Sequence, residues 1–254
     1  MSEAGGGKRV GFLVAGAQKA GTTALFDYLA ELPGLELPAV KEAHFFDDEE
    51  RVDWRAPDYD LYHALFRDTG RLWGEATPIY LYWPNALERI RAYNPAIKLI
   101  LLFRDPIERA WSHWKMEYAR GKETEPFGWC IREGRARMAD ADPYPGFHRV
   151  YSYVERGYYG RQLARVMRLF PRDQLLLIGS DDLRREPTAT IRKVCEFLNI
   201  AAPAGDIAPK ISRPAADIDY PATLSGEDVA FLQRQFADEM LRFRALAGKD
   251  AAIA

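Results

Sequence analysis

Cysteine is scarce in this chain of 254 residues, and the two that occur, Cys130 and Cys195, cannot form a disulfide framework. A reducing compartment is therefore expected, and we predict a cytoplasmic protein. The four histidines are scattered, with neither an HExxH pair nor a CxxC motif in the sequence. We predict no structural or catalytic zinc site and no requirement for a metal.

A strong charge of one sign and long apolar runs are also missing. The formal net charge is −2 at pH 7, whereas a general nucleic-acid or membrane-surface binder needs a broad basic field. The first ten residues are polar and rich in glycine, and the apolar run after them is too short for a signal-peptide core or a membrane span. We expect no nucleic-acid partner, no membrane insertion and only local recognition of anions; the oligomeric state stays open.

What the sequence does contain is an alternation of strand-like and helix-like segments. Strands are predicted at 10–14, 73–75, 98–103 and 174–179, and helices at 21–32, 58–66, 84–93, 159–170, 187–198 and 225–247, with another opening at Pro106. Strand 98–103 is continuously apolar after its lysine, which is typical of the centre of a parallel sheet. The pattern predicts one α/β domain over 1–254, with a mostly parallel sheet flanked by helices and a flexible segment at 1–8.

The chain is organised around residues 10–25, VGFLVAGAQKAGTTAL, where a short apolar run gives way to a glycine-rich turn and then a helix. Gly16 and Gly21 allow the backbone to turn sharply and approach a ligand, and N–H groups at the helix start point at an anion. The spacing resembles a Walker A loop, but Thr22 occupies the usual lysine position and the cation is Lys19. The turn indicates a phosphate cradle; the alternative is an ordinary connection in which one of its threonines caps the helix.

A second informative segment is KEAHFFD, residues 41–47, which packs a cation, a carboxylate, an imidazole and two aromatic rings into one short stretch. Charged residues beside a Phe-Phe pair indicate a half-buried position, where Glu42 can act as a general base on a substrate hydroxyl. The alternative is a surface loop that its two phenylalanines anchor.

A third segment is Arg104-Asp105-Pro106, which follows strand 98–103 directly. Ligands of open α/β sheets bind at the carboxyl ends of the strands. If this strand neighbours the first one, Arg104 and Lys19 open onto the same crevice, and Arg104 can hold a phosphate with Ser112 beside it. The alternatives are a salt bridge from Arg104 to Asp105 or another carboxylate, and an ordinary helix position for Ser112.

Two later segments give weaker signals. Residues 201–221 are rich in proline and are expected to wrap around the domain, and their cations Lys210 and Arg213 are candidates to close over an anion. Residues 139–147, ADADPYPGF, are either a flap over a site or a surface connection. Candidates to stack on a sugar or an aromatic acceptor are aromatic residues that core packing can also explain, namely Trp111, Trp114, Trp129 and Tyr144.

Four ordered motifs, AQKAGTTAL, VKEAHFFD, GEATPIYL and LLFRDPIERAWSHW, together resemble the sulfotransferases that use 3′-phosphoadenosine 5′-phosphosulfate (PAPS). The resemblance is strongest to the heparan-sulfate-type carbohydrate branch and its bacterial relatives. The motifs lie within residues 10–114, and weaker similarity continues to about residue 198. The resemblance implies a P-loop-like nucleotide-binding core.

The resemblance also implies roles for individual residues. The turn that binds the 5′-phosphosulfate matches Gln18, Lys19, Ala20, Gly21, Thr22 and Thr23, and the pair that binds the 3′-phosphate matches Arg104 and Ser112. Glu42 matches the catalytic base, with Lys41 and His44 as neighbouring active-site residues. A substrate-side set matches Phe45, Glu75, Thr77 and Pro78. The chain departs from the heparan-type pattern at Ala76, where a lysine is common, and in the late nucleotide loop, for which Lys210 and Arg213 are the substitutes.

The expected reaction moves a sulfuryl group from PAPS to a hydroxyl, or as second choice an amine, of a carbohydrate or glycosylated small molecule. Such transfer requires alignment of the two oxygens and stabilisation of the developing charge, which Glu42 as base and Lys19 at the leaving phosphate supply. Two alternatives stay open. One is a P-loop kinase or NTPase, although the lysine of a GK[ST] motif is missing, and the other is a non-catalytic nucleotide or carbohydrate binder.

Overall fold

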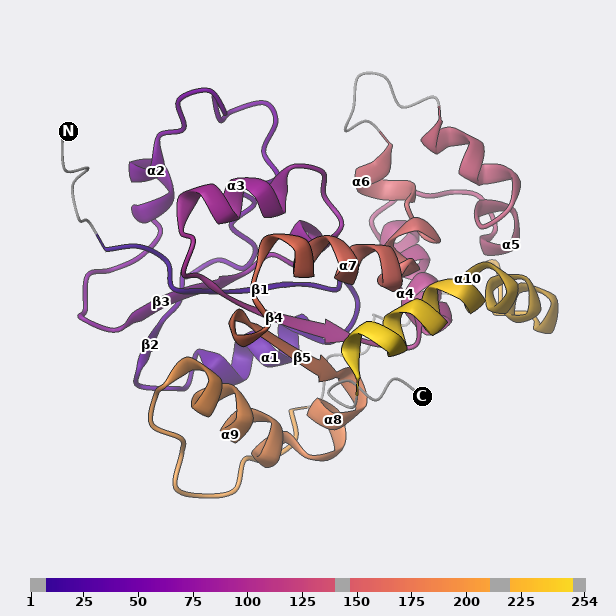
Figure 1. The fold of residues 1–254 in the computed structure, drawn as a ribbon. Coiled ribbons are helices and arrows are strands. Elements are labelled where there is room, and N and C mark those ends of the chain that lie inside the picture. Colours follow the sequence, from indigo (N-terminus) through magenta and orange to yellow (C-terminus); the bar gives the residue numbers. More distant parts are fainter. Residues whose placement is uncertain (1–7, 140–146, 211–219, 249–254) are drawn as a thin grey trace.

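A five-stranded parallel sheet with the strand order β2-β3-β1-β4-β5 lies at the centre of the protein (Figure 1). The computed structural model describes residues 8–139, 147–210 and 220–248. The strands are β1 (Phe12–Gly16), β2 (Leu35–Glu36), β3 (Leu72–Ala76), β4 (Lys98–Phe103) and β5 (Leu175–Gly179). The predicted α/β fold with a parallel sheet is confirmed.

The middle of the sheet is tightly packed around β1, whose residues are all buried. Phe12 pairs in register with Gly74 of β3, and a Cβ atom on Gly74 would lie 2.0 Å from Cε1 of the Phe12 ring. Glycine at this position therefore makes room for the ring. On the other side of β1, β4 is buried throughout after Lys98, as its continuous apolar run predicts.

Helices cover both faces of the sheet (Figure 1). On one face, below the strands in this view, lie α1 (Thr22–Leu29), α8 (Ser180–Arg185) and α9 (Pro187–Leu198), and above them lie α3 (Ala86–Tyr93) and α7 (Tyr159–Leu169). Beyond the carboxyl ends of the strands gather α4 (Pro106–Ala119), α5 (Phe127–Cys130), α6 (His148–Tyr151) and α10 (Gly226–Ala247), and α2 (Tyr59–His63) lies toward the opposite end. Short 3₁₀ helices occupy Pro78–Leu81, Glu133–Met138, Glu155–Gly157 and Arg172–Gln174.

Several element boundaries differ from the sequence-based expectation. The helix expected from Pro84 begins at Ala86, because Asn85 adopts left-handed backbone angles with φ 61°. The helix expected to reach residue 32 ends at Leu29, with Ala30 as its C-cap. Strand β2 has only two residues and was not predicted.

The ends of the chain are described only in part. Residues 1–7 of the expected flexible segment lie outside the described residues, whereas Lys8 forms an ion pair with Asp68 at 3.0 Å. Among the described residues, no helix is both long and apolar enough to cross a membrane.

The strand order determines where in the fold the candidate site lies. From β1 the chain leads to β2 on one side of the sheet, and from β4 it leads to β5 on the other side, although β1 and β4 are neighbours. The loops that leave these two strands therefore diverge at their carboxyl ends and open a crevice, which is where α/β sheets of this kind bind ligands. The condition for Lys19 and Arg104 to share one crevice is thus met.

Candidate active site

The turn between β1 and α1 forms an open cradle. Lys19 and Gly21 both have left-handed backbone angles, with φ 71° and 96°. The N-cap of α1 is Gly21, which has no side chain to cap the helix, and Thr22 is already the first residue of the helix, so the alternative in which a threonine is the N-cap is wrong. Thr22 and Thr23 line the cleft, and Ala20 is buried beneath the turn. The N–H groups of the first helical turn can therefore hold an anion.

The electrostatics of the turn also favour an anion. Burial lowers the pKa of Lys19, and the nearby cations Arg120, Arg104 and Lys41 lower it further against the opposing charge of Glu117. Glu117 pairs with Arg120 at 3.4 Å, and Lys19 has no ion pair with a carboxylate of the described residues. A negatively charged group bound here would relieve the local excess of positive charge.

Arg104 lies on the same cleft, at the carboxyl end of β4, together with Ser112 of α4. Its guanidinium pairs with Glu108 one turn along α4, with Nη2 2.8 Å from Oε2. Asp105 is not its partner, because the Asp105 carboxylate caps α4 by accepting from the N–H groups of Ile107 and Glu108 at 3.0 and 2.8 Å. The side chain of Arg104 is 35% exposed, and it can exchange this surface partner for a phosphate.

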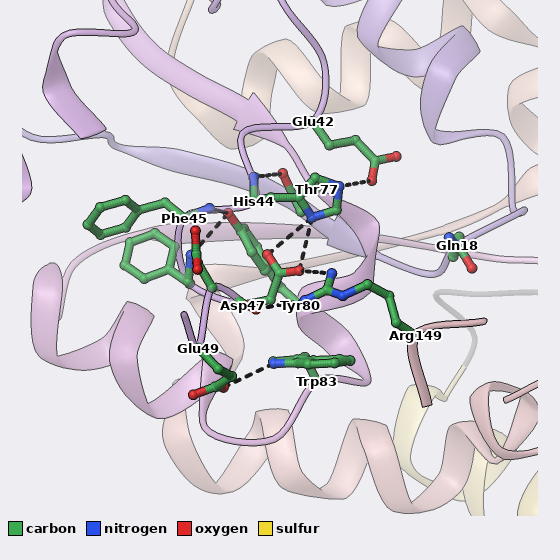
Figure 2. Close-up of polar contacts among 12 residues, drawn as sticks. Gln18, Glu42, His44, Phe45, Asp47, Glu49, Thr77, Tyr80, Trp83 and Arg149 are labelled. Carbon is green, nitrogen blue, oxygen red and sulfur yellow. Dashed lines mark hydrogen bonds and ion pairs between the residues drawn. The ribbon is translucent and has the colours of Figure 1, made fainter. Parts of the chain in front are cut away.

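Opposite the cradle, the 41–47 segment forms a chain of charged groups (Figure 2). Glu42 receives two cations on its two oxygens: Lys41 Nζ lies 3.1 Å from Oε1, and His44 Nε2 lies 3.2 Å from Oε2. The other ring nitrogen of His44 lies 2.9 Å from Oδ2 of Asp47. The backbone N–H of His44 donates to Thr77 Oγ1 at 3.4 Å. The loop thus holds Glu42 at the cleft and orients it from both sides.

The pKa values of this chain follow from its contacts. Burial opposes ionisation of Glu42, but the contacts with His44 and Lys41 outweigh it and lower the pKa of Glu42 to about 2. Burial likewise opposes charge on His44, but Asp47 and Glu42 outweigh it and raise the pKa of His44 to about 9. At neutral pH the loop therefore holds an imidazolium between two carboxylates.

Two arginines that the sequence did not single out complete this arrangement. Arg149 of α6 lies 2.5 Å from Asp47 Oδ2 although 102 residues separate them. Arg156 is almost fully buried and donates to Gln18 Oε1 of the cradle across 138 residues. Asp47 belongs to the KEAHFFD motif, but no role was predicted for it. No local sequence signal marks the two arginines, because both contacts form only when distant segments meet.

The residues assigned to the substrate side lie mostly beneath the 41–47 loop. Pro78 lines the cleft. Phe45 stacks on Tyr62 with ring centroids 4.7 Å apart, and Thr77 donates to Glu75 at 2.7 Å. Burial raises the pKa of Glu75 to about 7. Glu75 and Thr77 therefore support the loop from below, Phe45 anchors it through its ring, and Pro78 alone of the four lines the cleft.

The cleft has a volume of about 2150 Å³ and joins the Lys19 turn, the 41–51 loop, α4 and α6. Its rim includes Lys210, whose ammonium pairs with Glu31 at 2.7 Å and also donates to the carbonyl of Asp27 on α1. Arg213, its expected companion, lies outside the described residues. Lys210 therefore closes one edge of the cleft against α1.

The aromatic candidates for stacking separate into core and surface. Trp114 is fully buried and stacks on Trp111, with centroids 4.9 Å apart. Trp129 is 39% exposed, and the guanidinium of Arg137 lies over its ring. Tyr144 and most of the 139–147 segment lie outside the described residues.

Within the described ranges, no group of three or more histidine, cysteine or acidic side chains is placed to hold a metal ion.

Together, the strand order, the cradle and the crevice at the β1–β4 switch define an α/β protein whose crevice can accommodate an anion. Residues 11–213 match the family model of the sulfotransferase domain. The chain therefore belongs to the sulfotransferase family, and the resemblance inferred from its motifs is confirmed.

Individual relatives support the same assignment. The chain is 28% identical over 195 residues to heparan sulfate glucosamine 3-O-sulfotransferase 3B1 of Mus musculus, a match covering 74% of this chain and 45% of the relative. Heparan sulfate glucosamine 3-O-sulfotransferase 5 of Mus musculus is 29% identical over 191 residues, covering 74% and 53%. The chain thus spans about half the length of these curated relatives. The crystal structure of a sulfotransferase from Alicyclobacillus acidocaldarius matches with a TM-score of 0.78 and 27% identity, over 96% of this chain and 97% of that one.

Proposed function

We propose that this protein transfers a sulfuryl group from PAPS to a hydroxyl of a carbohydrate or a glycosylated small molecule, with an amine as the second choice. The observation that carries the proposal is the shared cleft: the Lys19 turn and Glu42 come from two different loops and both line it. One side offers an anion cradle in which Lys19 pairs with no carboxylate of the described residues, and the other offers an oriented carboxylate.

The residues of the cradle fit the cofactor. Lys19 and the first-turn N–H groups of α1 suit a phosphosulfate, and Arg104 with Ser112 suits a second phosphate. Bound there, PAPS supplies the sulfuryl group and an adenosine 3′,5′-bisphosphate leaving group. Lys19 would stabilise the negative charge that grows on the phosphate oxygen as its bond to sulfur breaks.

Glu42 is the proposed general base. It accepts the proton of the acceptor hydroxyl while the hydroxyl oxygen forms its bond to sulfur, and the electron pair of the broken S–O bond remains on the leaving phosphate. Its pKa of about 2 makes it a weak base as long as Lys41 and His44 both hold it. Lys41 lines the same cleft and is close enough to Lys19 to lower its pKa, so the Lys41 ammonium would turn from Glu42 toward a phosphosulfate held in the cradle. Losing that cation raises the pKa of Glu42 and strengthens the base when cofactor is present.

Calorimetric titration tests the cofactor. We expect adenosine 3′,5′-bisphosphate to bind tightly without Mg²⁺, and Arg104→Ala to weaken that binding about tenfold or more, the loss of one charge-assisted contact. Preference for ATP or GTP with Mg²⁺ would favour the kinase alternative, which the structure makes less attractive because Asp105 at the end of β4 is engaged as a helix cap. Tight binding of the bisphosphate without turnover on any acceptor would favour the non-catalytic binder.

The acceptor class rests on the relatives, whose names specify heparan sulfate glucosamine. We propose a sugar hydroxyl as acceptor on that basis, offered as a small molecule or an oligosaccharide. A cytoplasmic location stays a prediction from the sequence.

A further inference from the structure

Asp47, a fully buried carboxylate, lies behind the His44–Glu42 pair and is held by two cations (Figure 2). From the same loop, His44 Nδ1 lies 2.9 Å from Oδ2 and 3.2 Å from Oδ1. From α6, Arg149 Nη1 donates to Oδ2 at 2.5 Å, and Nη2 donates to the backbone carbonyl of Asp47 at 2.8 Å. Arg149 thus grips both the side chain and the main chain of one residue.

The guanidinium of Arg149 is itself fixed in place. Its Cζ atom lies 4.3 Å from the centroid of the Trp83 ring, a cation–π arrangement that restricts the plane of the group. The backbone carbonyl of Arg149 accepts from Arg156 Nη2 at 2.9 Å, and Arg156 also donates to Gln18 of the cofactor turn. One short segment of α6 therefore connects to both sides of the cleft.

A buried carboxylate needs a compensating cation, since burial of an unpaired charge is costly. His44 can compensate Asp47 only while its ring is protonated, whereas an arginine keeps its charge at all working pH values. With Arg149 present, Asp47 remains compensated whatever the state of His44. The orientation of the imidazole then does not depend on the charge of His44 alone. The same holds for Glu42, whose Oε2 lies 3.2 Å from Nε2 of that ring.

We propose that Arg149 is a positioning residue of the active site, which acts on Glu42 through Asp47 and His44. The proposal rests on the proposed role of Glu42 as general base. Arg149 does not contact Glu42 in the structure. It pairs with the carboxylate of Asp47, which pairs with the ring of His44, and that ring orients Glu42 (Figure 2).

Other charged or titratable groups also face this chain from the elements packed around it. The 41–47 loop and the strand and 3₁₀ helix beneath it contribute Lys41, Glu42, Glu75 and Tyr80. Of these groups, Lys41 contacts only Glu42. Glu75 accepts hydrogen bonds from Thr77 and Tyr62, and burial raises its pKa to about 7. Of the described residues, Arg149 is the only cation besides His44 that forms an ion pair with Asp47.

Removal of Arg149 should change the pKa of His44 in a direction that follows from the contacts. Asp47 would then pair with His44 alone, and the repulsion between the two cations would disappear. Both changes favour the protonated ring, so the pKa of His44 should rise further above its present value of about 9. Glu42 would meanwhile lose part of its orientation, which lowers turnover.

The experiment compares Arg149→Gln, Arg149→Lys and the wild type by two readouts. The first follows the ring signals of ¹⁵N-labelled histidine through a pH titration, with His44→Gln to assign the signals among four histidines. The second measures kcat and KM for acceptor with PAPS across pH. A matched control is Arg132→Gln, because Arg132 also pairs with an aspartate, Asp228 at 2.6 Å, and lies over an aromatic ring, Phe231, away from the cleft.

We expect Arg149→Gln to raise the pKa of His44, to shift the alkaline limb of kcat to higher pH and to lower kcat about tenfold to a hundredfold, the effect of a misplaced catalytic group. Binding of adenosine 3′,5′-bisphosphate should stay close to wild type, and Arg149→Lys should restore part of the loss. The control should change thermal stability without moving either pH readout. An unchanged His44 titration in folded Arg149→Gln would overturn the proposal. Because that titration needs no turnover, it decides the case even if PAPS proves not to be the cofactor.

Discussion

The charge on His44 is expected to stabilise the folded protein by an amount that depends on pH. Its pKa is raised from the ordinary value of 6.5 to about 9 in the folded protein. A group with a raised pKa stabilises the folded state fully below its unfolded pKa, and this contribution is lost as pH rises through the folded pKa. The relevant window therefore runs from about pH 6.5 to about pH 9.

The pKa difference corresponds to about 3 kcal/mol at about 1.4 kcal/mol per tenfold change. The His44 side chain is 41% exposed, so solvent screening reduces this figure, and we expect about 1–2 kcal/mol. Urea unfolding at pH 6 and pH 10 of wild type and His44→Gln measures it, because other groups that titrate in this range are common to both proteins. Wild type should lose about 1–2 kcal/mol more than the variant between the two pH values. Equal losses in the two proteins would refute the assignment of an imidazolium to this loop.

Two further predictions follow from other contacts. Lys41→Gln removes the cation 3.1 Å from Glu42, so the acid limb of kcat/KM for PAPS, which reports the enzyme before the cofactor binds, should move up from about pH 2 toward the ordinary glutamate range; a limb that stays in place would show that Lys41 does not act on the base. Gly74→Ala places a Cβ 2.0 Å from the Phe12 ring in the middle of the sheet and should cost about 3 kcal/mol or more of unfolding free energy. Gly226→Ala, which meets nothing within 4 Å, should be nearly neutral in the same denaturation assay.

The sequence predicted those parts of the fold that local patterns determine. Helix α9 runs over the predicted range 187–198, since a proline opens it and its apolar residues recur at helical spacing. The helix predicted over 225–247 is α10, which opens with a capping box in which Asp228 N donates to Ser225 Oγ at 3.1 Å. The convergence of Lys19 and Arg104 followed from a single topological assumption, that the two strands are neighbours.

Contacts between distant segments explain what the sequence could not predict. Arg149 and Arg156 reach the site through pairings with Asp47 and Gln18 that span 102 and 138 residues. An arginine in a helix gives no sign of which carboxylate or amide it will meet. Lys210 was a candidate from the sequence and lies on the rim of the cleft, but its pairing with Glu31, 179 residues away, could not be predicted.

The central claim is that Glu42 removes a proton from the acceptor. The most direct test is the rate of sulfuryl transfer from PAPS by Glu42→Gln, with the binding of adenosine 3′,5′-bisphosphate and the unfolding temperature measured on the same preparation. The account predicts a loss of about a hundredfold or more in kcat, as expected for one general base, while nucleotide binding stays intact. Turnover within a few-fold of wild type by a folded, nucleotide-binding variant would contradict it.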